Sequence, residues 1–223
     1  MNTMERNIEK IDADYVLLIM NCEKYREKAL GQKKTWIPEI PSNIVYYHVL
    51  GNPSLDTPFA FDEKEKILWV KTMDDYISLP KKVVASYAAI QERYTFQYIF
   101  KTDDDQILSN SRFFGTISGL LESKKPKVHY GGQHIKVEIP YLSQYYKLHP
   151  ELPQDMIVQS TDYCTGRFYL LSHEAVANLI TKRESVEKEY LEDYAIGLNL
   201  HPFFKKNMLP IKSDKIFTDY DSK

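Results

Sequence analysis

The stretch YIFKTDDDQI, residues 98–107, places three consecutive aspartates directly behind an apolar segment. The run 96–102 is apolar enough to predict a buried strand. Asp103, Asp104 and Asp105 follow at the carboxyl end of that strand. Like charges at this spacing repel one another, so the triplet is either a solvated turn or a place where a cation binds.

The residues before this stretch alternate between apolar strand patterns and amphipathic helix patterns. Strands are predicted over 15–20, 43–51 and 64–70, and helices over 22–37 and 79–94. Such alternation is typical of an α/β fold with a mainly parallel central sheet. Ligands of these sheets bind beyond the carboxyl ends of the strands, so the position of the aspartates favours a functional site.

The carboxyl-terminal half of the chain is less regular. The patterns predict a helix over 109–124, a hairpin or two short strands over 127–139, a strand over 163–172, a helix over 173–184, and a helix or a loop entering one over 189–201. Residues 140–156 form a connection rich in tyrosine and proline, and residues 212–223 are expected to be a polar tail. No internal repeat and no linker rich in Gly or Ser divides the chain, so we expect a single domain over residues 1–223.

The composition is that of a globular protein without a strong bulk charge. Lys plus Arg number 29 against 31 Asp plus Glu, a formal net charge of -2. This balance gives no reason to expect nucleic acid or an anionic membrane as a partner. Residues 1–15 show no signal core, and the longest apolar run, 15–20, is too short to span a bilayer. We therefore expect a soluble, cytoplasmic chain without a membrane span.

Three neighbouring carboxylates suit a hard divalent cation. Mn²⁺ and Mg²⁺ prefer oxygen ligands, and the short aspartate side chain stays close to the backbone that positions it. In an extended turn, residues two apart point the same way, so Asp103 and Asp105 would converge while Asp104 points elsewhere. A cation bound there could also hold a diphosphate by neutralising its charge.

Five segments of the chain resemble, in order, the β-1,3-galactosyltransferase and Fringe-type glycosyltransferases. They are KKTW (33–36), DDYISLPKK (74–82), KTDDD (101–105), YCTGRFYLLS (163–172) and LEDYAIGL (191–198). Each motif alone is weak, whereas five in the right order are specific, and the resemblance covers most of the chain. It implies a GT-A fold with a Rossmann-like sheet flanked by helices. It also implies transfer of a sugar from a UDP-sugar donor, with a divalent cation, usually Mn²⁺, as cofactor.

The resemblance makes Asp105 the strongest metal ligand. Asp103 and Asp104 would meet the metal, the ribose or the donor sugar. Family members also carry a late histidine that completes the metal coordination, and this chain has no histidine at the corresponding place. Asp214 is the nearest substitute by position, and His201 is a remoter candidate.

Further basic and acidic residues are assigned to the donor side by the same resemblance. Lys82 matches a family lysine that faces the donor phosphates or sugar, a task that suits a point charge. Asp74 or Asp75 would help to hold the nucleoside, although either could instead cap a helix. Lys33 and Lys34 stand before Thr-Trp, where the family often has arginine.

The pair Gly166-Arg167 departs from the two glycines that the family carries after its Tyr-Cys-Ser segment. A bulky cation at this place would narrow the sugar pocket or contact a phosphate of the donor. Both residues are therefore predicted to lie at the donor site, and the identity of the donor sugar stays open.

Asp193 matches the acidic residue that is proposed as the catalytic base in inverting members of the family. An acceptor hydroxyl must lose its proton as it attacks the anomeric carbon, and a carboxylate on the face opposite UDP can take it. Glu192 would be its neighbour, in contact with donor or acceptor hydroxyls. A retaining transferase on the same fold, or a nucleotide-sugar-binding protein without catalysis, is the alternative.

These observations predict a metal-dependent transferase that moves a hexose-type sugar from a UDP-sugar to a hydroxyl of a glycan or glycoconjugate acceptor. The nucleotide-binding half would cover about residues 13–108 and the acceptor-side half about residues 109–217, with the tyrosine-rich segment 140–149 shaping the acceptor side. The chain resembles the catalytic core of virus-encoded or bacterial relatives, or one domain of a longer polypeptide.

Overall fold

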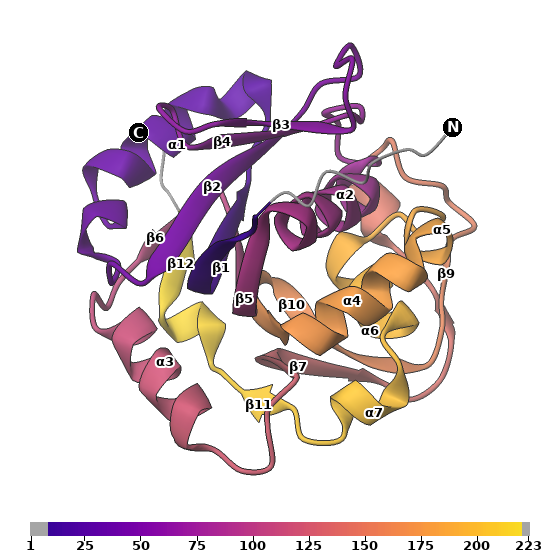
Figure 1. The fold of residues 1–223 in the computed structure, drawn as a ribbon. Helices are drawn as coiled ribbons and strands as arrows, with labels where there is room; N and C mark the ends of the chain where they lie inside the picture. Colours follow the sequence, from indigo (N-terminus) through magenta and orange to yellow (C-terminus); the bar gives the residue numbers. More distant parts are fainter. Residues whose placement is uncertain (1–8, 220–223) are drawn as a thin grey trace, which may run out of the picture.

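The computed structural model describes residues 9–219, and the main strands of this part assemble into one eight-stranded sheet (Figure 1). From edge to edge the strands are β11 (Leu209–Pro210), β7 (Tyr130–Val137), β10 (Thr161–Ser172), β5 (Tyr94–Asp103), β1 (Ile11–Met20), β2 (Ile44–Gly51), β4 (Ile67–Val70) and β3 (Phe59–Asp62). Strands β5, β1, β2 and β4 are parallel, as are β11 and β7. Strand β10 is antiparallel to β5 and β7, and β3 is antiparallel to β4. The predicted α/β fold with one mainly parallel sheet and one domain is confirmed.

Helices connect the strands and cover both faces of the sheet (Figure 1). The α-helices are α1 (Arg26–Lys34), α2 (Leu79–Arg93), α3 (Phe113–Ser123), α4 (His173–Thr181), α5 (Arg183–Val186), α6 (Glu192–Asn199) and α7 (Pro202–Lys205). Short 3-10 turns are η1 (Glu23–Tyr25), η2 (Ile37–Glu39), η3 (Tyr145–Lys147) and η4 (Ser213–Lys215), and two small ladders pair β6 (Gln106–Leu108) with β12 (Phe217–Asp219) and β8 (Tyr141–Leu142) with β9 (Ile157–Val158). No helix of residues 9–219 is both long and apolar enough to cross a bilayer.

Alternation along β1 explains why a continuous apolar run lies at the centre of the sheet. Tyr15 and Leu17 are fully buried on one face, in a core that includes side chains of α3. Val16 and Leu18 are fully buried on the opposite face, in a core shared with α2, α4 and α6. Each such side chain contributes about 1.5–3 kcal/mol through its removal from water. Figure 1 shows the two helical layers, with α1 and α3 on one side of the strands and α2 and α4 on the other.

Segment 127–139 forms neither the predicted hairpin nor two short strands, because the single strand β7 runs through the glycine pair. Gly131 and Gly132, around which the turn was predicted, instead allow β7 to pack closely against its neighbouring strands. A Cβ atom on Gly132 would lie 2.7 Å from Cβ of Cys164, and one on Gly131 would lie 2.9 Å from Cβ of Leu209. Glycine is therefore required by the neighbouring strands, a demand that local sequence does not reveal.

The carboxyl-terminal residues are also not the expected polar tail. Residues 213–219 form η4 and β12, and Phe217 is fully buried in the core that contains α3. The predicted helix 173–184 is divided into α4 and α5, and the edge strand β3 was not predicted. Residues 1–8, which belong to the segment without a signal core, and residues 220–223, which belong to the expected polar tail, lie outside the described residues.

Candidate active site

Three chain segments meet at the carboxyl end of β5. The aspartate turn leaves β5 there, and β10 passes beside it because Phe168 is paired with Thr102. The backbone N–H of Gly166 in β10 donates to Asp193 at the start of α6, at 2.9 Å. The predicted donor residues and the predicted base thus come from separate elements that only the folded chain brings together.

The three aspartates of the turn differ in their exposure. The side chain of Asp103 is 31% exposed, and Asp105 is half-buried. Asp104 is buried, and its Oδ2 accepts a hydrogen bond from Nδ2 of Asn21 at 2.7 Å. Burial raises the pKa of Asp104 to about 7, against the attraction of the Lys28 ammonium. Asp103 and Asp105 are therefore the two carboxylates of the turn that are open to a ligand.

Side chains of the segment around KKTW hold the backbone of the aspartate turn. Nε2 of Gln32 donates to the carbonyls of Asp103 at 3.0 Å and Gln106 at 2.9 Å. Nε1 of Trp36 donates to the same Gln106 carbonyl at 3.1 Å. Oε1 of Gln32 is paired with Nε2 of the buried His48 at 3.0 Å. The motif thus contributes to the site by fixing the turn, and neither Gln32 nor His48 was predicted from the sequence.

A lysine of the KTDDD motif is buried at the centre of the site. Lys101 is 1% exposed, and its Nζ lies 2.7 Å from Oδ1 of Asp103 and 2.9 Å from Oε2 of Glu192. Burial disfavours the ammonium charge, but attraction to the two carboxylates is larger and raises the pKa of Lys101. Burial also raises the pKa of Asp103 to about 6 and that of Glu192, in each case against the attraction of Lys101. A lysine inside an apolar strand was the signal in the sequence that could have singled out this residue.

Asp193 is held by two backbone N–H groups. Gly166 donates to its Oδ2 at 2.9 Å, and Tyr194 donates to its Oδ1 at 2.7 Å. Burial raises the pKa of Asp193, while Lys101 and the two N–H groups favour the ionised form. A carboxylate with a fixed direction and a raised pKa is suited to accept a proton.

Aromatic side chains line the vicinity of Asp193. Burial raises the pKa values of Tyr76, Tyr145 and Tyr163, and the negative charge of Asp193 is the next largest cause for each. The ring of His149 stacks on Tyr76 with centroids 4.0 Å apart and planes 5° apart. The ring of Tyr145 is also nearly parallel to that of His149, with centroids 6.4 Å apart. Residues from the predicted acceptor segment thus meet the DDYISLPKK segment beside the carboxylate.

Lys82 and Asp74, two predicted donor-site residues of the DDYISLPKK segment, bond to each other and to backbone groups of the protein. Nζ of Lys82 is buried and donates to Oδ1 of Asp74 at 2.6 Å and to the carbonyl of Asn21 at 2.8 Å. Asp74 also accepts from the backbone of Gly51 and Glu23, both at 2.8 Å. The pair therefore joins the ends of β1 and β2 to α2.

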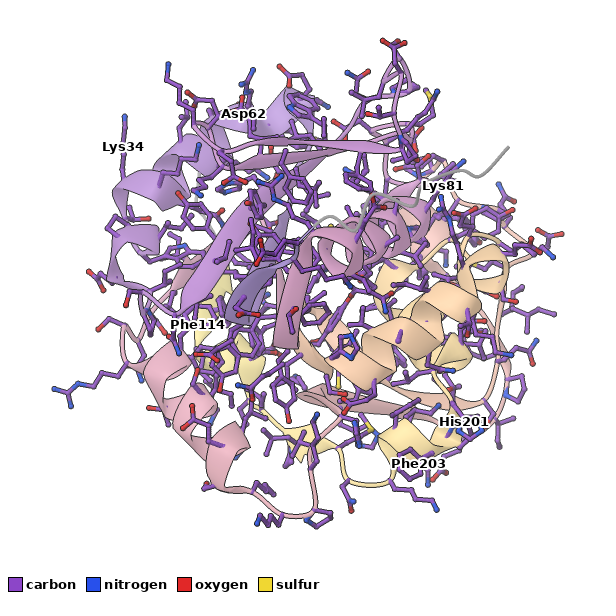
Figure 2. The ribbon with its side chains drawn as sticks, in the orientation of Figure 1. Lys34, Asp62, Lys81, Phe114, His201 and Phe203 are labelled. Atoms are coloured by element: carbon purple, nitrogen blue, oxygen red, sulfur yellow. The ribbon has the colours of Figure 1, made fainter. Side chains whose placement is uncertain are left out.

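Asp75 and Lys33, the first of the two lysines before Thr-Trp, have structural contacts as well. Oδ1 of Asp75 accepts from the backbone N–H of Ser78 at 2.8 Å, in the turn before α2. Ser78 is the N-cap residue of α2, and no side chain of the described residues caps this helix. Nζ of Lys33 donates to the carbonyl of Glu65. Figure 2 shows Lys34 projecting outward from α1.

Arg167 joins the aspartate turn to the carboxyl-terminal segment. Its Nη1 donates to Oε1 of Gln106 and the carbonyl of Phe217, both at 3.0 Å, and lies 2.9 Å from Oδ1 of Asp219. Its Nε lies 3.3 Å from Oδ1 of Asp214, whose Oδ2 accepts from Nε2 of Gln133 at 2.6 Å. Asp214, which was predicted as a third metal ligand, therefore has one carboxylate oxygen beside the guanidinium of Arg167 and the other bonded to the amide of Gln133.

The histidines have local roles. Nδ1 of His201 accepts from the backbone of Phe203 at 3.2 Å and so caps α7, where Figure 2 labels both residues. His129 is paired with Ser172 at 2.8 Å, and His134 with Asp162 at 2.9 Å. Within residues 9–219, no group of three or more His, Cys, Asp and Glu side chains is arranged to hold a metal ion. Asp103 and Asp105 offer carboxylate oxygens, the type of ligand that hard cations prefer.

A mainly parallel sheet with an acidic turn at the end of a central strand, and a carboxylate at the start of a neighbouring helix, has the arrangement expected of GT-A glycosyltransferases. The family model described as Galactosyltransferase matches residues 26–203, which is most of the chain. The chain therefore belongs to the galactosyltransferase family and is a glycosyltransferase. Its sequence has no match among the curated proteins.

Solved structures share the fold at low sequence identity. A glycosyltransferase involved in the glycosylation of the major capsid of PBCV-1 is 12% identical, with a TM-score of 0.55 over 94% of each chain. The glycosyltransferase GlyE of Streptococcus pneumoniae TIGR4 is 13% identical, with a TM-score of 0.46 over 91% of this chain and 46% of that one. The 2-C-methyl-D-erythritol 4-phosphate cytidylyltransferase of Francisella tularensis is 10% identical, with a TM-score of 0.46 over 90% of this chain and 92% of the other. The first of these likenesses shows the fold that was expected.

Proposed function

We propose that this glycosyltransferase transfers a hexose-type sugar from a UDP-sugar to a hydroxyl of a glycan or glycoconjugate, with inversion at the anomeric carbon. The observation that carries this proposal is the junction of β5, β10 and α6. There, Asp193 and the aspartate turn are connected through Lys101, Glu192 and the peptide of Gly166. The donor and the proton acceptor would thus be held by one rigid group of residues.

In this proposal Asp193 removes the proton of the acceptor hydroxyl. Two backbone N–H groups orient its carboxylate, so little reorganisation is needed when the hydroxyl attacks. The raised pKa strengthens the carboxylate as a base.

A divalent cation, Mn²⁺ or Mg²⁺, would be held by Asp103 and Asp105. When bound, such a cation neutralises charge on a diphosphate. Asp104 and Asp214 are left out of this set because both oxygens of each carboxylate are engaged, by Asn21 and Lys28 in the first and by Arg167 and Gln133 in the second. Among the described residues, only one oxygen of Asp103 and one of Asp105 is engaged in this way, by Lys101 and Gln106 respectively. Arg167, whose side chain is 26% exposed, would add a positive charge near the donor phosphates.

The acceptor would bind on the aromatic side of the site. The stacked rings of Tyr76, His149 and Tyr145 offer flat apolar faces of the kind that pack against sugar rings. These rings lie near Asp193. The attacking hydroxyl has to lie there too, because Asp193 would accept its proton.

The donor class is tested by thermal unfolding with UDP, GDP and ADP, each with and without Mn²⁺. Of the three nucleotides, we expect only UDP to raise the melting temperature. The increase should be larger when Mn²⁺ is present. No shift with any nucleotide would contradict the choice of donor. A screen of UDP-sugars that reads UDP release and the product anomer then tests the reaction. A product with retained configuration would replace inversion by retention, and binding of UDP without transfer would indicate a protein that has lost catalysis.

Asp193→Asn is expected to lower kcat at least about 1000-fold while leaving UDP affinity within a few-fold, because the amide cannot accept the proton. Asp105→Asn should instead lose the metal-dependent part of UDP binding. Asp56→Asn, at an exposed loop position, is the matched control and should behave as wild type. Near-normal turnover of Asp193→Asn would remove this residue as the base.

A further inference from the structure

Lys101 makes more contacts than its place in the motif suggests. Its ammonium carries three N–H donors, and the structure provides three acceptors from three different elements. These are Oδ1 of Asp103 at 2.7 Å, Oε2 of Glu192 at 2.9 Å and the carbonyl of Gly166 at 2.9 Å. Because every donor is used and the side chain is 1% exposed, the ammonium is not free to contact a ligand.

The contact with Gly166 connects Lys101 to Asp193 through one backbone residue. The carbonyl of Gly166 accepts from Lys101, and its N–H donates to Oδ2 of Asp193. A Cβ atom on residue 166 would lie 3.3 Å from Nζ of Lys101, and 3.6 Å from the nearest oxygens of both Asp103 and Glu192. The absence of a side chain therefore allows the backbone to approach the ammonium closely.

The contact with Glu192 anchors the same ammonium to the core beneath α6. The other oxygen of Glu192 accepts from the hydroxyl of Tyr169, which is bonded to the hydroxyl of Tyr87 at 2.7 Å. Both tyrosines are fully buried, and Nζ of Lys101 lies 5.5 Å from the centroid of the Tyr169 ring. A satisfied buried network of this kind has one low-energy arrangement and resists displacement.

Removal of the ammonium would leave the neighbouring carboxylates without their shared counter-charge. Asp103, Glu192 and Asp193 would then repel one another in a medium that screens poorly. The carbonyl of Gly166 would lose its donor as well, and the peptide that orients Asp193 would be free to rotate.

We propose that Lys101 is a positioning residue that holds the base Asp193 at a set place relative to the donor-side carboxylate Asp103, through Glu192 and the peptide of Gly166. This role rests on the proposed transfer reaction. It requires no contact between Lys101 and either substrate. Loss of the ammonium should therefore reduce the rate of the chemical step more than the binding of donor or acceptor.

The test compares Lys101→Met with Lys205→Met. Lys205 is the matched control, because its Nζ also ties α6 to β10, through the carbonyl of Gly197 and Oγ1 of Thr161, both at 2.9 Å. We expect Lys101→Met to lower kcat about 100-fold, because a displacement of Asp193 by about 1 Å has an effect of this size. The KM values for donor and acceptor should change about fivefold or less. Lys205→Met should keep kcat within about threefold although its melting temperature falls. Turnover of Lys101→Met within about threefold of wild type would overturn the proposal.

A second variant covers the case in which Lys101→Met does not fold. Lys101→Arg keeps the positive charge, but its larger planar head cannot meet the three acceptors without moving Gly166 or Glu192. We expect it to bind UDP as the wild type does, with kcat lowered at least about tenfold. Wild-type kcat in this variant would contradict a positioning role.

Crystal structures separate failure of this role from failure of the proposed function. If the wild type transfers no sugar, the proposed function fails, and the role of Lys101 is still decided by comparing wild type with Lys101→Met or Lys101→Arg. The proposal expects the contact between Gly166 N–H and Asp193 to open in the variant. An unchanged contact would overturn it.

Discussion

At the scale of single residues, His48 shows how the fold sets the protonation state of a side chain. It is 1% exposed, and its Nε2–H donates to Oε1 of Gln32. Within the described residues its Nδ1 has no hydrogen-bond partner. A second proton would thus create a buried cation without an acceptor, and burial lowers the pKa of His48 to about 3.

This depressed pKa predicts a loss of stability in mild acid. As the pH falls below about 6.5, the unfolded chain binds a proton at His48 that the folded chain does not bind until about pH 3. The free energy of unfolding should therefore decrease by about 2 kcal/mol through this residue between pH 6.5 and pH 5. Urea unfolding of wild type and His48→Gln at both pH values measures the difference.

His48→Gln should lose part of the pH dependence that the wild type shows. An identical pH dependence in wild type and His48→Gln would show that His48 is protonated in the folded protein.

At the scale of elements, the position of α6 depends on how closely it packs on β10. A Cβ atom on Gly197 would lie 2.2 Å from Cβ of Tyr163 and 2.7 Å from the carbonyl of Asp162. Neither atom can move away easily, because the Cβ atom of Tyr163 is bonded directly to the backbone and the carbonyl of Asp162 is part of the backbone. This glycine belongs to the LEDYAIGL segment, and it allows the first turn of α6 to bring Asp193 to Gly166.

Gly197→Ala should therefore push α6 away from β10. We expect the free energy of unfolding to fall by about 1–3 kcal/mol, and kcat to fall with it as Asp193 is displaced. Gly115→Ala in α3 is the matched control, because no described atom lies within 4 Å of its added Cβ. Alanine there should stabilise the helix by about 0.5–1 kcal/mol. Equal stability and turnover of Gly197→Ala and wild type would contradict the packing argument.

At the scale of the whole molecule, residues 213–219 return to the site, beside the strand that follows the aspartate turn. Strand β12 pairs with β6, which directly follows the aspartates. The ring of Phe217 stacks on Phe168 with centroids 5.2 Å apart, in the core beneath α3. Arg167 adds polar contacts from the middle of the sheet to Asp214 and Asp219.

Arg167→Ala is expected to loosen residues 213–219 more than the rest of the fold. These ion pairs are partly exposed, so the change in global stability should be small. Local opening should increase, and amide hydrogen exchange at β12 should become about tenfold faster or more. Arg183→Ala, which removes an ion pair with Glu187 on α5, is the control. Unchanged exchange at β12 would mean that Phe217 packing alone holds the segment.

The sequence by itself determined strands β1, β2, β4, β5 and β10 of the central sheet, the helices that connect them and the place of the aspartate turn. These features depend on apolar alternation and on residues only a few positions apart, such as those of the run 15–20. The ordered motifs added the family and with it the fold, both of which the comparisons confirm. The roles predicted for Asp193 and the three aspartates stay predictions for the experiments above.

Only the tertiary structure decided which polar side chains meet. Lys101 bonds to Glu192 across 91 positions of the chain and to Gly166 across 65. The ion pair of Asp214 with Arg167 and the hydrogen bond from Gln32 to the backbone of the aspartate turn also join residues that are far apart in the sequence. No local pattern encodes such pairs, because they arise when the strand order of the sheet brings distant segments side by side and burial then obliges each polar group to find a partner.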